Sequence, residues 1–156
     1  MKPTHLFVQA GCGGLAAAMT LGLKDWLAAP GAVIVVEPEK AACVAAALNQ
    51  GRVVRVPGDL VTSAEMLSCG EASAPALDVL RQAGAKAMTV SDAALAEATA
   101  LLSECGGPGT TPSGAAGLAG AMTAVASPDA SRGMALDAGS RILLVVTETE
   151  LDKDEP

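Results

Sequence analysis

Thr4-His-Leu-Phe-Val-Gln-Ala-Gly-Cys-Gly-Gly-Leu-Ala-Ala17 decides the fold of this chain, because it predicts an apolar strand that enters a glycine-rich turn and then a helix. Such a turn presents unpaired backbone N–H groups at the positive end of a helix dipole. Glycine permits positive φ angles there and lets an anion approach the backbone closely. The stretch therefore predicts a binding site for a phosphorylated small molecule, starting at Gly11.

The same alternation of strand and helix continues along the chain. Ala32-Val-Ile-Val-Val36 is typical of a strand buried on both faces of a parallel sheet. Strands are predicted at 6–10, 32–36, 52–56, 86–90 and 142–146, helices at 14–27, 39–50, 63–70, 76–83, 91–103 and 113–126, and polar turns at 127–139. We predict a single α/β domain over residues 1–150, with a mostly parallel sheet flanked by helices in three layers.

The composition limits the class of partner. A formal net charge of −7 argues against nucleic acid and against an anionic membrane surface. Acidic side chains crowd the C-terminus, and we expect 151–156 to be a solvated acidic tail. Residues 6–23 carry no charge, but the apolar run before Cys12 is short for the core of an export signal, and Gln9 with four glycines would weaken a spanning helix. A cytoplasmic protein is therefore expected.

The cysteines predict no metal centre. The chain has four cysteines, which lie far apart without a C-x-x-C pair, and one histidine, so a zinc site is not expected. We expect free thiols in a reducing cytosol, with Cys12 a turn residue rather than a nucleophile. His5 is expected to be a structural residue at the start of a strand.

One interpretation of the turn is a dinucleotide site. Gly11-x-Gly13-x-x-Ala16 follows a predicted strand, and Glu37 stands at the end of the next one. A dinucleotide-binding fold places its phosphate turn and its ribose-binding acid at these positions. The alternative is that Glu37 is a solvent-facing residue at a strand end, since any βαβ unit with a tight first turn produces much of this pattern.

Longer matches support a second interpretation. The matching segments, in chain order, are Phe7-Val-Gln-Ala-Gly-Cys-Gly-Gly14, Val36-Glu-Pro38, Met66-Leu-Ser-Cys-Gly-Glu71, Pro112-Ser-Gly-Ala-Ala-Gly-Leu-Ala-Gly120 and Leu144-Val-Val-Thr-Glu148. This succession resembles the C-terminal portion of diaminopropionate ammonia-lyase and its relatives, the fold-type II (tryptophan synthase β-like) pyridoxal phosphate enzymes. The resemblance covers essentially the whole chain and implies part of the large domain of such an enzyme.

The resemblance implies a cofactor, pyridoxal 5'-phosphate, and positions that bind it. The glycine-rich turn of the family holds the cofactor phosphate, which by match falls on Gly11, Cys12, Gly13, Gly14 and Leu15. The group that faces the pyridine nitrogen at the end of the last strand corresponds to Thr147. A neutral hydroxyl at this place suits elimination, because it does not force the pyridine to stay protonated.

The resemblance also implies what this chain lacks. The family's Schiff-base lysine belongs to a segment ahead of the region matched here, so we expect no ammonia-lyase turnover by the chain alone. It would be a fragment of a lyase that eliminates ammonia from 2,3-diaminopropionate or a similar small amino acid, with a companion N-terminal chain or self-association into a homo-oligomer. The alternatives are a NAD(P)-binding Rossmann-type domain and a non-catalytic module that binds a phosphate ligand or a partner.

Overall fold

A parallel sheet of four strands, in the order β3-β2-β1-β4, forms the centre of the part of the chain that the computed structural model describes, residues 1–148. The strands are β1 (His5–Gln9), β2 (Ala32–Pro38), β3 (Lys86–Val90) and β4 (Ile142–Leu144). The helices are α1 (Gly14–Leu23), α2 (Cys43–Gln50), α3 (Ala74–Gln82), α4 (Asp92–Glu104), α5 (Pro112–Ala126) and α6 (Pro128–Gly133), with 3-10 turns at Glu39–Ala41 and Glu65–Leu67.

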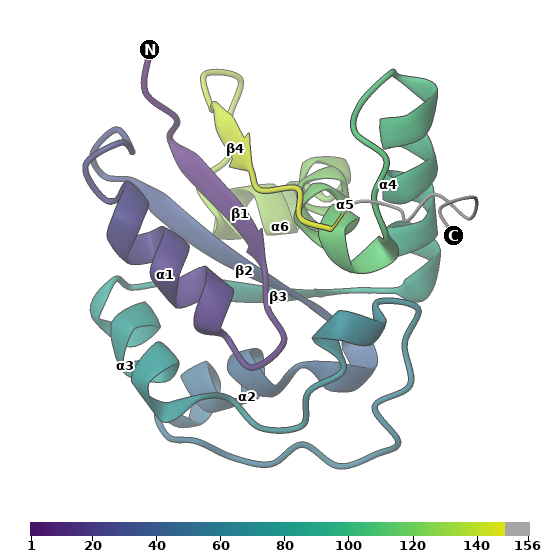
Figure 1. The fold of residues 1–156 in the computed structure, drawn as a ribbon. Helices are drawn as coiled ribbons and strands as arrows, with labels where there is room; N and C mark the ends of the chain where they lie inside the picture. The colour runs from purple at the N-terminus through teal and green to yellow at the C-terminus, as the bar shows by residue number, and fades with distance from the viewer. Residues whose placement is uncertain (149–156) are drawn as a thin grey trace.

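Helices cover both faces of this sheet, so the predicted three layers are confirmed (Figure 1). Helices α1, α2 and α3 pack on one face, while α4, α5 and α6 lie on the other. The strand pleat explains the division, since successive side chains point to opposite faces. Leu6 and Val8 enter the core beneath α1, α2 and α3, whereas Phe7 enters the core beneath α4 and α5.

Helix α5 approaches the sheet closely because small residues face it. A Cβ atom on Gly120 would lie 2.5 Å from Cγ2 of Val36, and one on Gly117 would lie 3.0 Å from the carbonyl oxygen of Phe7. Ordinary carbon contacts need more room than this. The small-residue helix predicted at 113–126 is therefore the inner helix of its layer, and its glycines set the distance to β1 and β2.

The structure corrects three predicted elements. Residues 52–56 form no strand of the sheet because they pair with residues 70–71: Arg55 forms one antiparallel bridge with Glu71, and the Val56 N–H donates to the Gly70 carbonyl oxygen over 2.9 Å. Residues 63–70 contain only the 3-10 turn at Glu65–Leu67, since long-range hydrogen bonds hold the start of this segment. Thr62 Oγ1 donates to Asp92 Oδ1 over 2.6 Å, and the Ser63 N–H donates to the same oxygen over 2.9 Å. The predicted turn at 127–139 includes helix α6.

The sequence contains a signal for the N-terminus of α6 that the prediction overlooked. Pro128 stands in its first turn, and the Ser127 hydroxyl accepts a hydrogen bond from the Ala130 N–H. In the described residues no helix is both long enough and apolar enough to cross a membrane. The boundary expected at residue 150 and the acidic tail at 151–156 lie outside the described residues.

Candidate cofactor-binding site

The predicted phosphate turn follows β1 directly and combines a buried glycine, Gly13, with an exposed one, Gly14. Gly13 has a φ of +95°, and a Cβ atom there would lie 3.2 Å from Val44 Cγ2. Gly14 is exposed, with nothing within 4 Å of an added Cβ, and Leu15 is 38% exposed. The turn therefore rests on the α2 side of the core at Gly13 and presents its next two residues outward.

The N-terminus of α1 has free donors to offer. No side chain of the described residues caps this helix, and the Ala17 N–H donates to the Gly13 carbonyl over 2.9 Å as the first helical bond. The N–H groups ahead of Ala17 thus lie in the turn without an intrahelical acceptor. Backbone donors and the positive end of the helix dipole suit a phosphate group without any lysine or arginine, so the residues present fit the phosphate of pyridoxal phosphate.

Thr147 lies beyond the end of β4 and is held from two sides. Gln9 Nε2 donates to Thr147 Oγ1 over 2.8 Å, and Thr110 Oγ1 donates to the Thr147 carbonyl oxygen over 2.6 Å. Gly114 makes this crossing possible, since a Cβ atom there would lie 1.8 Å from that same carbonyl oxygen. The glycine of the Ser-Gly-Ala segment therefore fixes how closely the end of the last strand passes the start of α5.

The sheet places both halves of the predicted site at one edge. Strand β1 pairs in parallel with β4, so the turn from Gly11 to Leu15 and the Thr147 hydroxyl both follow carboxyl ends of neighbouring strands. Gln9 lies two positions before Gly11 and bonds Thr147 directly. In open α/β sheets, ligands bind outside the carboxyl ends of the strands. The structure brings these residues together, while their role as cofactor ligands stays a prediction.

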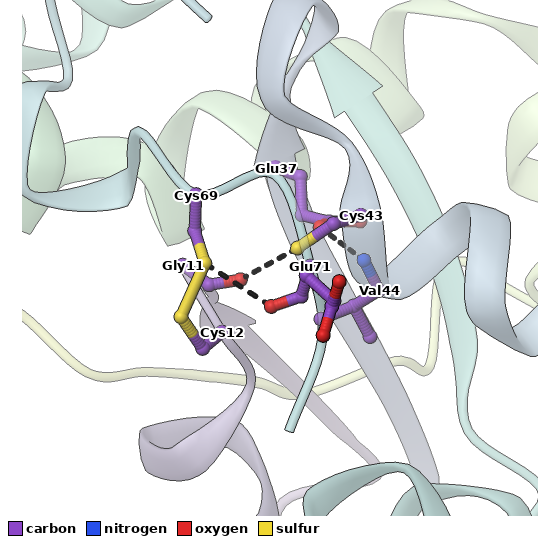
Figure 2. Close-up of a disulfide and its surroundings, with 7 residues drawn as sticks. All are labelled: Gly11, Cys12, Glu37, Cys43, Val44, Cys69 and Glu71. Atoms are coloured by element: carbon purple, nitrogen blue, oxygen red, sulfur yellow. Dashed lines mark hydrogen bonds between the residues drawn. A yellow bond between two sulfur atoms is a disulfide. The ribbon is translucent and has the colours of Figure 1, made fainter. Parts of the chain in front are cut away.

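A disulfide corrects the expectation that all four cysteines are free. Cys12 in the turn is bonded to Cys69, with Cα atoms 5.7 Å apart and a separation of 57 positions in the sequence (Figure 2). Cys43, which is buried, and Cys105, which is exposed, remain free thiols. The pairing was missed because it depends on tertiary packing. The segment that contains Met66 and Cys69 lies against the turn, since a Cβ atom on Gly11 would lie 3.2 Å from the Met66 carbonyl oxygen.

Glu37 corrects both interpretations that the sequence left open for it. Its side chain is fully buried, and its two carboxylate oxygens accept hydrogen bonds from the Val44 and Ala45 N–H groups, each over 2.7 Å. It therefore caps the start of α2 and faces neither solvent nor a ribose. Burial raises the pKa of Glu37 from 4.5 to about 7, against the lowering effect of these hydrogen bonds.

Cys43 lies between Glu37 and the turn and is unsuited to be a nucleophile. Its Sγ donates to the Gly11 carbonyl oxygen over 3.3 Å (Figure 2). Burial, with the nearby Glu37 charge, raises the pKa of Cys43 to about 11. Cys12 carries no free thiol in the disulfide, so it offers no nucleophile in this form.

Sequence reasoning missed Gln9 and Thr110 and was right about His5. Gln9 is a polar side chain in an apolar strand, which is the signal that points to it: it is 1% exposed and reaches Thr147. Thr110 precedes the Ser-Gly-Ala helix start and gave no separate signal. His5 is buried at the start of β1, and its Nε2 lies 3.0 Å from the Met134 carbonyl oxygen, which is a structural contact.

The chain is similar to known proteins in sequence and in fold. The family model "Pyridoxal-phosphate dependent enzyme" matches residues 1–148. Diaminopropionate ammonia-lyase of Salmonella typhimurium is 31% identical, over 97% of this chain and 40% of its own length. A crystal structure of diaminopropionate ammonia lyase from Escherichia coli superposes with a TM-score of 0.78 at 25% identity, covering 97% of this chain and 40% of that one.

A second solved structure, the threonine deaminase of T.th., superposes with a TM-score of 0.82 at 26% identity and covers 98% of this chain and 51% of that one. The chain thus spans about half or less of the length of the relatives it matches. The likeness to these structures confirms the α/β fold, in which an all-parallel sheet lies between helices.

Proposed function

Because this chain belongs to the family of pyridoxal-phosphate dependent enzymes, we propose that it forms the phosphate-binding half of an ammonia-lyase active site. The substrate proposed is 2,3-diaminopropionate or a similar small amino acid, supported by the likeness to diaminopropionate ammonia-lyases. The observation that carries the proposal is the uncapped turn after β1 beside the Thr147 hydroxyl after β4, at one edge of the sheet.

Each part of this half-site has a role. The N–H groups of the turn from Gly11 to Leu15 hold the phosphate, and the Thr147 hydroxyl meets the pyridine nitrogen. When bound, pyridoxal phosphate supplies the electron sink for loss of a β-substituent from an amino acid. The chain itself binds and orients, since Gln9 and Thr110 fix Thr147, and Gly114 leaves room for it.

The catalytic lysine is proposed to come from a companion N-terminal segment or chain, so the described part alone should not turn over substrate. Apolar side chains between α2 and α3 are open to such a partner or to a second copy: Met66, whose carbonyl oxygen approaches Gly11, is 73% exposed, and Val61 is 61% exposed. Light scattering at increasing concentration tests self-association, and a monomer at every concentration would contradict the homo-oligomer. The cytoplasm remains the proposed compartment, where the Cys12–Cys69 bond would have to persist against glutathione.

The alternatives have less support. A nicotinamide-binding domain needs an acid at the end of the second strand that is free to bind a ribose. Glu37 is at that place, but both of its oxygens are engaged by the start of α2. A phosphate-binding module without chemistry shares the turn with our proposal and differs from it in having no use for Thr147.

A titration of the purified chain with pyridoxal 5'-phosphate, followed by absorbance before and after borohydride, tests the proposal. We expect saturable binding without a lysine adduct that borohydride reduces. Absence of binding at millimolar cofactor would refute the phosphate site in this chain. Reduction of a stable adduct would instead show a reactive lysine among the residues present.

A matched pair of variants locates the phosphate. Gly14→Asp adds a carboxylate at the exposed start of α1, where an added Cβ meets nothing within 4 Å. Gly22→Asp is the control, because it adds a carboxylate in equally open space near the other end of the same helix. Repulsion should weaken cofactor binding by about tenfold or more in the first variant, which is about 1.4 kcal/mol. Equal affinity of the two variants would place the phosphate elsewhere.

A further inference from the structure

Gln9 is a deeply buried polar side chain beside the predicted site, and its hydrogen bonds are incomplete. It is 1% exposed, its Nε2 donates to Thr147 Oγ1 over 2.8 Å, and its Oε1 has no partner among residues 1–148. Buried polar groups are nearly always paired, and an unpaired one calls for an explanation. The explanation that follows from the bonding pattern concerns the direction of the Thr147 hydroxyl.

A hydroxyl has one proton to donate and lone pairs to accept with. Because Gln9 contributes an N–H, the Thr147 oxygen is the acceptor in this bond. The hydroxyl proton of Thr147 is then available to a second group at the edge of the sheet. A carbonyl or carboxylate in place of the Gln9 amide nitrogen would take that proton for itself.

The surroundings of Gln9 favour this orientation of its amide. Oε1 lies on the α5 side, 3.4 Å from where a Cβ atom on Gly117 would be, next to a helix whose own carbonyls are used within it. The observed orientation leaves one amide N–H and Oε1 without a partner among residues 1–148, whereas turning the amide over would leave both N–H groups unpaired. Buried N–H groups without a partner are rarer than carbonyl oxygens without one, which favours the observed orientation.

We propose that Gln9 is a positioning residue that sets the Thr147 hydroxyl as a hydrogen-bond donor. The ligand group at this position must then be an acceptor, and for the cofactor of the proposed function, on which this inference rests, it is an unprotonated pyridine nitrogen. A protonated nitrogen would set two donors against each other. Gln9 thereby selects the protonation state of the bound ring while itself touching only Thr147.

The first test needs no cofactor. In the free chain, the side-chain amide protons of Gln9 are followed by nuclear magnetic resonance in the wild type and in Thr147→Val, which keeps the side-chain shape. Loss of the bond should speed exchange of one amide proton with water about fivefold to tenfold, as expected for a net hydrogen bond near 1 kcal/mol. Equal exchange in both proteins would overturn the Gln9–Thr147 bond.

The second test measures the ring nitrogen itself. Pyridoxal 5'-phosphate labelled with ¹⁵N is bound to the wild type, to Gln9→Glu and to Gln9→Met, the last a match in length without hydrogen bonds. We expect the chemical shift of an unprotonated nitrogen in the wild type and a shift toward the protonated value in Gln9→Glu, whose carboxylate can only accept from Thr147. Gln9→Met should lie between them, with unchanged phosphate affinity.

Identical nitrogen shifts in all three proteins, with cooperative unfolding confirming that the wild type and Gln9→Met are folded, would overturn the inference. Should Gln9→Glu fail to fold, the Gln9→Met comparison still decides it. Failure of the wild type to bind cofactor would refute the proposed function and the pyridine as the acceptor, while the exchange measurement on the free chain separately decides the Gln9–Thr147 bond.

Discussion

Reduction of the Cys12–Cys69 disulfide should destabilise this chain strongly. The bond closes a loop of 57 residues across the predicted phosphate turn. In the chain-entropy model, a loop of that length removes about 14 cal/mol/K from the unfolded state, which is about 4 kcal/mol at 25 °C. Since domains of this size are stable by only about 5–15 kcal/mol, the bond accounts for a large share of the total.

Urea unfolding measures this effect, with and without a reducing agent. With a dependence on urea of about 2 kcal/mol per molar, reduction should lower the midpoint by about 2 M. A variant with both Cys12→Ser and Cys69→Ser should unfold where the reduced wild type does and should not respond to the reducing agent. Cys105→Ser is the matched control, because Cys105 is exposed and unpaired, and it should leave the midpoint unchanged.

A count of thiols decides whether the reasoning holds. The oxidised chain should react at Cys105 when folded, and at Cys43 as well once denatured, with Cys12 and Cys69 reacting only after reduction. Four reactive thiols in the denatured chain before reduction would refute the disulfide. A disulfide that is present, but whose reduction leaves the midpoint unchanged, would refute the loop-entropy argument.

Two glycine substitutions and one at Glu37 give further predictions. Gly114→Ala should destabilise the fold and weaken cofactor binding in a titration, since its Cβ would lie 1.8 Å from the Thr147 carbonyl oxygen. Gly22→Ala, in open space on α1, should instead raise the free energy of urea unfolding by about 0.5–1 kcal/mol. Because the pKa of Glu37 is raised to about 7, the folded state binds its proton more tightly than the unfolded state does. The resulting stabilisation of about 3 kcal/mol is complete below pH 4.5 and should be lost as the pH rises through 7. Glu37→Gln should flatten the dependence of unfolding free energy between pH 5 and 8, and an unchanged slope would contradict the assignment.

The layers and the position of the turn were predictable because they depend on local patterns. The run from Ala32 to Val36 has the composition of a strand buried on both faces, and the turn at Gly11 combines a strand end with a helix start. Thr147 was found through a resemblance rather than a local pattern. The structure then places it beside Gln9, as a common sheet edge requires.

The errors arose where distant residues decide the local structure. The segment 63–70 has helical residues, but bonds from Thr62 and Ser63 to Asp92 hold it in another shape. Tertiary contacts of this kind override propensity. Cys12 and Cys69 are 57 residues apart, and Glu37 is a cap for a helix that starts several residues later. The spacing of these residues along the sequence does not predict such contacts.

Strand β1 positions both halves of the predicted site. The phosphate turn begins two residues after its end, and Gln9 at its end holds Thr147. The turn is further fixed by the Cys12–Cys69 bond and by the Ser73 N–H, which donates to the Cys12 carbonyl oxygen over 2.8 Å. A ligand that spans the two halves therefore meets groups whose separation is set before it binds, which lowers the cost of ordering them. Residues 1–148 should therefore give the same backbone chemical shifts with and without pyridoxal 5'-phosphate, except near the turn and Thr147, and widespread shift changes would contradict this rigidity.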